Sequence, residues 1–154
     1  MPSGYLDDVM DVPARRKIVA DLCETLRKLR KRTKIDAIVC RGISGMSVSF
    51  QVSDATDIRM VVVRKTNEVC HGWNVEFGSN SIEQQTHPIK NYVVIDDVIT
   101  TGETMEFIMA KMQESTPNMP TIILYGRQSK ASIEYFLKRF EGNRKPRVIG
   151  LNLY

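Results

Sequence analysis

Apolar residues along this chain switch repeatedly between a helical spacing and short continuous runs. Six of them between Ile18 and Leu29 share one helical face, and the runs 35–39, 58–63, 92–95, 121–125 and 147–151 have the length and β-branched content of strands. A further strand is expected over 73–77. Helices are expected from about Val12 into the basic run after Leu26, over 46–52 and 104–114, and from a Ser129 cap to Phe140. Residues Arg41–Gly45 are expected to form a loop.

The order of these elements predicts an α/β fold with a mainly parallel, twisted sheet flanked by helices on both faces. No internal repeat, low-complexity tract or linker divides the chain, so residues 1–154 are expected to form a single domain. Ligands of such sheets bind beyond the carboxyl ends of the strands. The informative loops are therefore those after Val39, Val63 and Ile95.

Composition agrees with a globular protein, with 42% hydrophobic and 26% charged residues. No apolar run is long enough to cross a membrane, and the N-terminal residues do not resemble a signal peptide, so a cytoplasmic protein is expected. The three cysteines are widely spaced and form no CxxC motif. Reduced, unpaired thiols are favoured over a disulfide framework or a zinc site.

A net charge of +4 is concentrated in the basic run 27–34. Such a run can contact nucleic acid, or it can close a helix, where cations complement the helix dipole. The second interpretation is favoured because no aromatic residues are interleaved to stack on bases. A nucleic-acid partner is therefore not expected.

The loop after the strand 92–95 carries the clearest chemistry. It reads Asp96-Asp97-Val98-Ile99-Thr100-Thr101-Gly102-Glu103-Thr104 and runs directly into a helix. Backbone N–H groups at the start of a helix bind anions, a glycine allows close approach, and threonine hydroxyls donate further hydrogen bonds. Two adjacent acids would repel a phosphate, but they could accept hydrogen bonds from sugar hydroxyls or meet a divalent cation. A phosphorylated ribose fits this loop better than a simple capping cluster, which needs only one acid.

This stretch, 94–104, resembles the motif by which type I phosphoribosyltransferases bind 5-phosphoribosyl-1-pyrophosphate (PRPP). Arg41-Gly42 resembles the pyrophosphate loop of that family, and Arg64-Lys65 resembles the basic pair before its flexible catalytic loop. Residues 75–83 resemble the segment before the PRPP strand in adenine phosphoribosyltransferases. The similarity spans about Ile35 to Tyr125.

The resemblance implies a role for each matching residue. Asp96 and Asp97 would hold the ribose hydroxyls and lie near Mg²⁺, directly or through water, and Glu76 would act on the base. The implied catalytic residues are Arg41, Lys65, Glu76 and Asp97. The implied PRPP-binding residues are Arg41, Gly42, Arg64, Lys65, Asp96, Asp97, Val98, Ile99, Thr100, Thr101, Gly102, Glu103 and Thr104.

The activity implied is transfer of the phosphoribosyl group of PRPP to a nucleobase, with a nucleoside 5′-monophosphate and pyrophosphate as products. A purine is favoured, adenine first, because the Glu-Phe-Gly sequence at 76–78 resembles that of adenine enzymes. The Val-Ile-Thr-Thr-Gly sequence at 98–102 is closer to that of orotate enzymes, so orotate is the second candidate. The base-binding hood and the candidate lid, Arg64 to Val75, are short, which leaves a non-catalytic PRPP-binding regulator as a further alternative. The resemblance also implies a homodimer.

Overall fold

The computed structural model describes residues 5–64, 75–76, 88–142 and 144–154. They form a six-stranded sheet in the order β3-β2-β1-β4-β5-β6. All neighbouring strands are parallel except β2 and β3, which are antiparallel. The expected α/β fold with a mainly parallel sheet is confirmed. The strands are β1 (Ala37–Cys40), β2 (Met60–Val63), β3 (Val75–Glu76), β4 (Tyr92–Asp96), β5 (Thr121–Gln128) and β6 (Arg147–Leu153).

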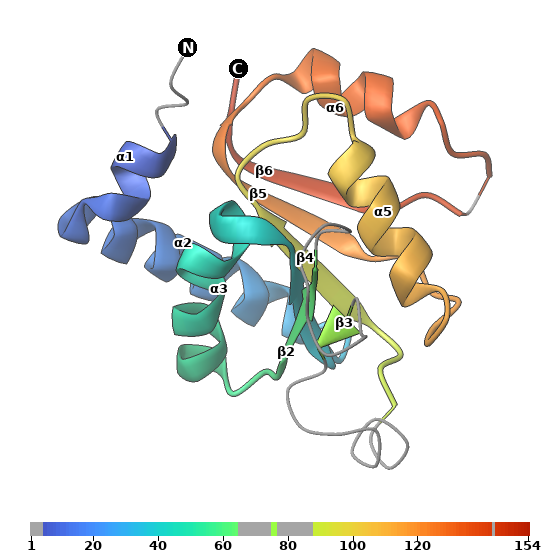
Figure 1. Ribbon diagram of the computed structural model, residues 1–154, viewed down its shortest axis with the longest axis horizontal. Helices are drawn as coiled ribbons and strands as arrows, with labels where there is room; N and C mark the ends of the chain where they lie inside the picture. The colour runs from blue at the N-terminus through green and yellow to red at the C-terminus, as the bar shows by residue number, and fades with distance from the viewer. Residues whose placement is uncertain (1–4, 65–74, 77–87, 143) are drawn as a thin grey trace.

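Helices cover both faces of this sheet (Figure 1). Helices α1 (Tyr5–Met10), α2 (Val12–Arg30) and α3 (Gly42–Thr56) lie on one face, and α5 (Glu103–Met112) and α6 (Lys130–Leu137) lie on the other. Side chains alternate between the two faces along a strand, so Val93 and Ile95 join the core under α2 and α3, while Val94 joins the core under α5 and α6. The central strand β4 is buried along its whole length.

Local sequence explains where the helices begin and end. Asp11 caps α2 by accepting a hydrogen bond from the backbone N–H of Ala14 at 3.0 Å, and the last turn of α2 is basic. The basic run therefore closes a helix, as expected, because cations stabilise the negative end of the helix dipole. Ser129 caps α6 in the expected position.

The expected loop at Arg41–Gly45 is wrong, because α3 already begins at Gly42 instead of near Met46. Gly42 has a φ of 73°, which lets the chain turn straight from β1 into the helix. A Cβ atom on Gly45 would lie 2.7 Å from Cβ of Cys40 and 2.9 Å from the carbonyl oxygen of Ile95. These glycines therefore allow the helix to approach the sheet closely, and they do not mark an open loop.

Four further points differ from the expectations or lie outside the described residues. Helix α1 was not expected, and β5 continues to Gln128, beyond the expected end at Tyr125. Only Val75–Glu76 of the strand expected at 73–77 is described, and most of the candidate lid lies outside the described residues. Among the described residues, no helix combines the length and apolar character that a membrane span requires.

Candidate active site at the carboxyl edge of the sheet

The parallel arrangement brings the predicted site residues to one edge of the sheet. Arg41 follows β1, Arg64 follows β2, and the acid pair Asp96–Asp97 stands at the end of β4. These strands are neighbours in the order β2-β1-β4, so their carboxyl ends lie side by side. Lys65 lies outside the described residues. Glu76 pairs through its backbone with Val62 of β2, and its side chain is not described.

The loop between β4 and α5 has the geometry of an anion site. Residues 98–105 enclose a small pocket of about 40 Å³. Gly102 forms the N-cap of α5 with a φ of 85°, a conformation that a side chain would strain. Thr100 and Thr101 are exposed beside the start of the helix, where backbone N–H groups carry partial positive charge. The loop can therefore offer both amide and hydroxyl donors to a phosphate.

The two acids at the start of this loop are almost completely buried, with exposures of 5% for Asp96 and 7% for Asp97. Oδ1 of Asp96 accepts a hydrogen bond from the hydroxyl of Ser44 at 2.8 Å and another from the backbone N–H of Asp97 at 2.9 Å. Burial raises the pKa of Asp96 well above its usual range, and so do the hydrogen bond to the Asp97 carboxyl group and the charge of Asp97. The Ser44 hydroxyl opposes this shift. Asp96 therefore binds a proton more readily than an isolated carboxylate does.

Ser44 is itself held by a residue of β5. The hydroxyl of Tyr125 donates to the carbonyl oxygen of Ser44 at 2.6 Å. A chain of contacts therefore runs from Tyr125 through the first turn of α3 to Asp96. The sequence did not indicate a role for either residue, because the contact joins positions that are 81 residues apart.

Gln128, at the end of β5, fixes the middle of the loop between β4 and α5, the candidate phosphate loop. Its Oε1 accepts from the backbone N–H of Ile99 at 2.6 Å, and its Nε2 donates to the Ile99 carbonyl at 3.0 Å. The Gln128 side chain is buried, with 1% exposed. Arg139 adds a second support by donating to the carbonyl of Thr101 and pairing with Glu106 at 2.8 Å. Neither residue could be found from motif spacing, since both follow the motif by more than twenty positions.

Gly126 allows β5 to lie close against the start of the same loop. Its N–H donates to the carbonyl oxygen of Asp97 at 2.8 Å. A Cβ atom at this position would lie 2.8 Å from that oxygen and 3.0 Å from Cγ1 of Val98. The glycine is therefore required by the close packing of two backbones.

Arg41 connects the first strand to the helix behind the phosphate loop. Its guanidinium carbon lies 4.0 Å from the centre of the Phe107 ring in α5, a favourable cation–π contact. The Nε atom of Arg41 is buried and has no hydrogen-bond partner among the described residues. A buried donor of this kind at the edge of the site is suited to an anionic ligand.

Cys40 ends β1 directly behind the acid pair. Its side chain is fully buried, and burial raises the pKa of the thiol to about 12, with a further contribution from the charge of Asp96. The thiol is therefore protonated at neutral pH and adds no charge to the site. Cys23 and Cys40, the cysteines in the described part of the chain, are both free.

No protein-family model matches the chain. Among curated proteins, an adenine phosphoribosyltransferase of Mycoplasma capricolum is 30% identical over 128 residues, covering 68% of this chain and 74% of that protein. The adenine phosphoribosyltransferase of Mycoplasma mycoides is 34% identical with the same coverage.

Solved structures share the fold. Adenine phosphoribosyltransferase from Saccharomyces cerevisiae superposes with a TM-score of 0.68 at 16% identity, covering 94% of this chain and 82% of that one. Orotate phosphoribosyltransferase from Aeropyrum pernix superposes with a TM-score of 0.66 at 15% identity, covering 95% of this chain and 74% of that one. The motif, the parallel sheet with its acid pair and phosphate loop, and these relatives lead to one conclusion: this chain belongs to the type I phosphoribosyltransferase family.

Proposed function

We propose that this protein transfers the phosphoribosyl group of PRPP to a nucleobase, with adenine as the favoured acceptor, and releases pyrophosphate. The observation that carries this proposal is the loop after β4, which presents a small pocket at a helix N-terminus beside a buried acid pair. The curated relatives named adenine phosphoribosyltransferase support adenine over orotate. Orotate is supported by the Val-Ile-Thr-Thr-Gly sequence at 98–102 and by a likeness of fold to an orotate enzyme at 15% identity.

PRPP would bind with its two ends on different elements. The 5′-phosphate would lie on the start of α5, where Thr100, Thr101, Gly102 and Thr104 supply hydroxyl and amide donors. The carboxylates of Asp96 and Asp97 would accept hydrogen bonds from the ribose hydroxyls. The remaining residues of the motif, Val98, Ile99 and Glu103, would contribute backbone to this subsite.

The pyrophosphate end would face the ends of β1 and β2. Arg41 and Gly42 would contact it at the start of α3, and Arg64 and Lys65 would approach it from the end of β2. Arg41 carries into this region a buried N–H that has no partner in the described part of the chain, which is the type of donor that a leaving pyrophosphate requires. These cations would stabilise the negative charge that develops as the bond breaks.

In the reaction, the bond between the anomeric carbon of ribose and the pyrophosphate oxygen breaks as a ring nitrogen of the base forms the new bond. The anomeric carbon acquires positive character, and the nearby Asp97 carboxylate would stabilise it electrostatically. Glu76 would orient the base and accept its proton. Pyrophosphate leaves with the electron pair of the broken bond.

The residues of this site suit a Mg²⁺ ion that is held jointly by the protein and the substrate. Among the described residues, no cluster of three or more His, Cys, Asp or Glu side chains could hold a metal ion alone. Mg²⁺ usually binds one or two carboxylates together with substrate phosphates and water, and Asp96 and Asp97 can supply the carboxylate share. When bound, the ion would neutralise charge on pyrophosphate as it departs.

The test is a turnover assay of the purified chain with Mg²⁺ and PRPP against adenine, guanine, hypoxanthine, xanthine, uracil and orotate. We expect pyrophosphate release and a nucleoside monophosphate with adenine. Turnover with orotate alone would assign the protein to the orotate class. PRPP binding without pyrophosphate release for every base would show a non-catalytic, PRPP-binding protein.

The cellular setting is also a proposal. We propose a cytoplasmic enzyme that acts as a homodimer, as the resemblance to the family implies. The free thiols of Cys23 and Cys40 agree with a reducing compartment. Sedimentation of the purified chain tests the dimer, since a protein that stays monomeric at assay concentration would contradict it.

A further inference from the structure

The amino edge of the sheet, remote from the site described above, is basic. Lys34, Arg59 and Lys90 stand just before β1, β2 and β4, and Arg147 is the first residue of β6. Because these strands are parallel, their amino ends lie along the same edge. Residues that are far apart in the sequence therefore bring positive charge together at the end opposite the acid pair.

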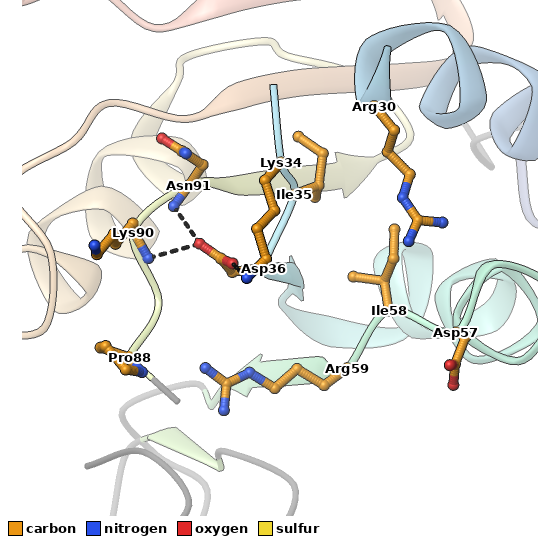
Figure 2. Close-up of a pocket in the computed structure, with 10 residues that line it drawn as sticks. All are labelled: Arg30, Lys34, Ile35, Asp36, Asp57, Ile58, Arg59, Pro88, Lys90 and Asn91. Carbon is orange, nitrogen blue, oxygen red and sulfur yellow. Dashed lines mark hydrogen bonds and ion pairs between the residues drawn. The ribbon is translucent and has the colours of Figure 1, made fainter. Parts of the chain in front are cut away.

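Part of this edge is hollowed into a pocket of about 680 Å³ (Figure 2). This volume is within the range of small-molecule sites, roughly 300–1,000 Å³. Four cations, Arg30, Lys34, Arg59 and Lys90, stand around the pocket. Ile35 and Ile58 supply apolar surface between them. The pocket thus has an apolar wall and several positive groups supplied by three stretches of the chain, 30–36, 57–59 and 88–91.

Among the described residues that line this pocket, cations outnumber acids. Its described lining holds two carboxylates, Asp36 and Asp57, against the four cations. Asp36 is already engaged, since it accepts from the backbone N–H groups of Lys90 at 2.9 Å and Asn91 at 3.0 Å and lies 3.6 Å from Nζ of Lys34. Burial would raise the pKa of Asp36, but these hydrogen bonds and the charge of Lys34 outweigh it and lower the pKa. Asp57 is exposed at the end of α3.

One of the cations is also held in place. Nη1 of Arg30 donates to the carbonyl oxygen of Thr56 at 2.8 Å, which fixes the guanidinium at the rim between α2 and α3. The other nitrogens of the same group remain to serve a ligand. A guanidinium fixed in this way loses less entropy when it binds an anion than a freely rotating side chain.

We propose that this pocket binds a small phosphorylated metabolite, at a second site that is separate from the PRPP loop. Phosphoryl groups suit it because four cations line one cavity and can contact more than one oxygen. None of the described residues around the pocket is aromatic, so recognition rests on charge and on the Ile35–Ile58 wall, not on stacking of a base.

A nucleic acid is the rival ligand, because the basic surface continues beyond the pocket. A second hollow of about 520 Å³ is lined by Lys28, Lys31, Arg32 and Arg147. A long polyanion could cross both hollows, whereas a small metabolite would depend on the first alone. The two ligands therefore differ in which residues they need.

The experiment titrates the full chain with inorganic tripolyphosphate by calorimetry, without Mg²⁺ and at low salt. The double variant Lys34→Gln/Lys90→Gln is compared with the control Lys17→Gln. Lys17 is an exposed lysine of α2, the helix that also carries Arg30, and it lies about 20 Å from Arg30 along the helix axis. We expect the double variant to bind tripolyphosphate about tenfold more weakly at one site, and the control to bind it with unchanged affinity. The circular dichroism spectra should match, since all three lysines are exposed.

The proposal is overturned if tripolyphosphate does not bind, or if the double variant binds it as tightly as the control does. Binding that remains in the double variant would belong to the phosphate loop after β4. A single-stranded RNA is titrated in parallel. RNA binding that falls steeply with salt and is weakened by Lys31→Gln/Arg32→Gln, with tripolyphosphate unable to compete, would replace the metabolite with a nucleic acid.

Discussion

The hydroxyl of Ser44 donates to Oδ1 of Asp96 at 2.8 Å, and this contact joins the first turn of α3 to the end of β4. Ser44 lies three residues after Arg41, at the proposed pyrophosphate end of PRPP, whereas Asp96 lies at the proposed ribose end. The hydrogen bond therefore couples the two halves of the site. It also stabilises the charged form of an acid that burial would otherwise keep protonated.

Replacing Ser44 with Ala removes that hydrogen bond, so the pKa of Asp96 should rise further. If ribose binding needs the ionised acid, the acidic limb of the pH profile of kcat/KM should move to higher pH. The KM for PRPP should increase by about tenfold, since a hydrogen bond to a charged group contributes roughly 1.5–3 kcal/mol. Steady-state kinetics from pH 5 to 9 measures both effects.

Ser44→Thr keeps the hydroxyl and should restore most of the affinity, while Ser115→Ala changes an exposed serine and should have no effect. An unchanged pH profile in Ser44→Ala would show that the contact is merely structural.

Replacing both acids with amides, Asp96→Asn with Asp97→Asn, should abolish PRPP binding while the fold survives. The amide groups are close in size to the carboxyl groups, but they lose the negative charge that the proposed ribose and magnesium contacts require. Calorimetric titration with Mg²⁺ and PRPP measures the loss. Affinity equal to that of the unmodified protein would refute the ribose assignment.

Asp96→Asn alone should change the pH dependence of stability. A carboxyl group whose pKa rises on folding contributes its full stability below the ordinary pKa of about 4, and this contribution is lost as the pH rises through the folded value of about 7. The amide is neutral at every pH, so Asp96→Asn should raise the melting temperature by a few degrees at pH 8 and change it little at pH 4. Equal shifts at both pH values would show that Asp96 is not protonated on folding.

Gln128→Met should loosen the phosphate loop. The thioether cannot pair with both the N–H and the C=O of Ile99, and each buried group left unpaired costs about 1–3 kcal/mol. We expect lower stability in urea and weaker PRPP binding. Gln113→Met, at an exposed glutamine after α5, serves as the control. A stability equal to that of the control would contradict the role given to Gln128.

Gly126→Ala should impair the same loop by crowding it. The new Cβ atom would press against the carbonyl oxygen of Asp97, which belongs to the backbone and cannot turn away, so a loss of about 1–3 kcal/mol is expected. Gly150→Ala is the matched change, because the three atoms nearest to its Cβ position all belong to the side chain of Leu153, which is 43% exposed and can move. Thermal melting compares the two variants, and equal melting temperatures would argue against the close packing at Gly126.

The sequence predicted the sheet and the phosphate loop because both depend on local patterns. Buried parallel strands need continuous aliphatic runs, and an anion loop needs its glycine and threonines at fixed positions before a helix. The predicted start of α3 was wrong because glycines such as Gly42 and Gly45 are typical of loops. In the structure they allow a helix to pack closely on β1 and β4.

The supports of the loop could not be predicted in the same way. These supports act through hydrogen bonds to main-chain groups: Gln128 to Ile99, Tyr125 to Ser44 and Arg139 to Thr101. Every residue has a main-chain carbonyl group, so the sequence does not indicate which one is bound. The positions of these supports depend on how far β5 extends and on where α6 ends. Such contacts follow from tertiary packing, which a single sequence does not display.

The fully buried side chain of Cys40 has a practical consequence for handling and regulation. Alkylating agents and peroxide attack the thiolate, and this thiol stays protonated throughout the physiological range. Although Cys40 lies close to the acid pair of the candidate active site, it should not make the enzyme sensitive to oxidants. Inactivation by iodoacetamide, if it occurs, must then begin at a different cysteine or after unfolding.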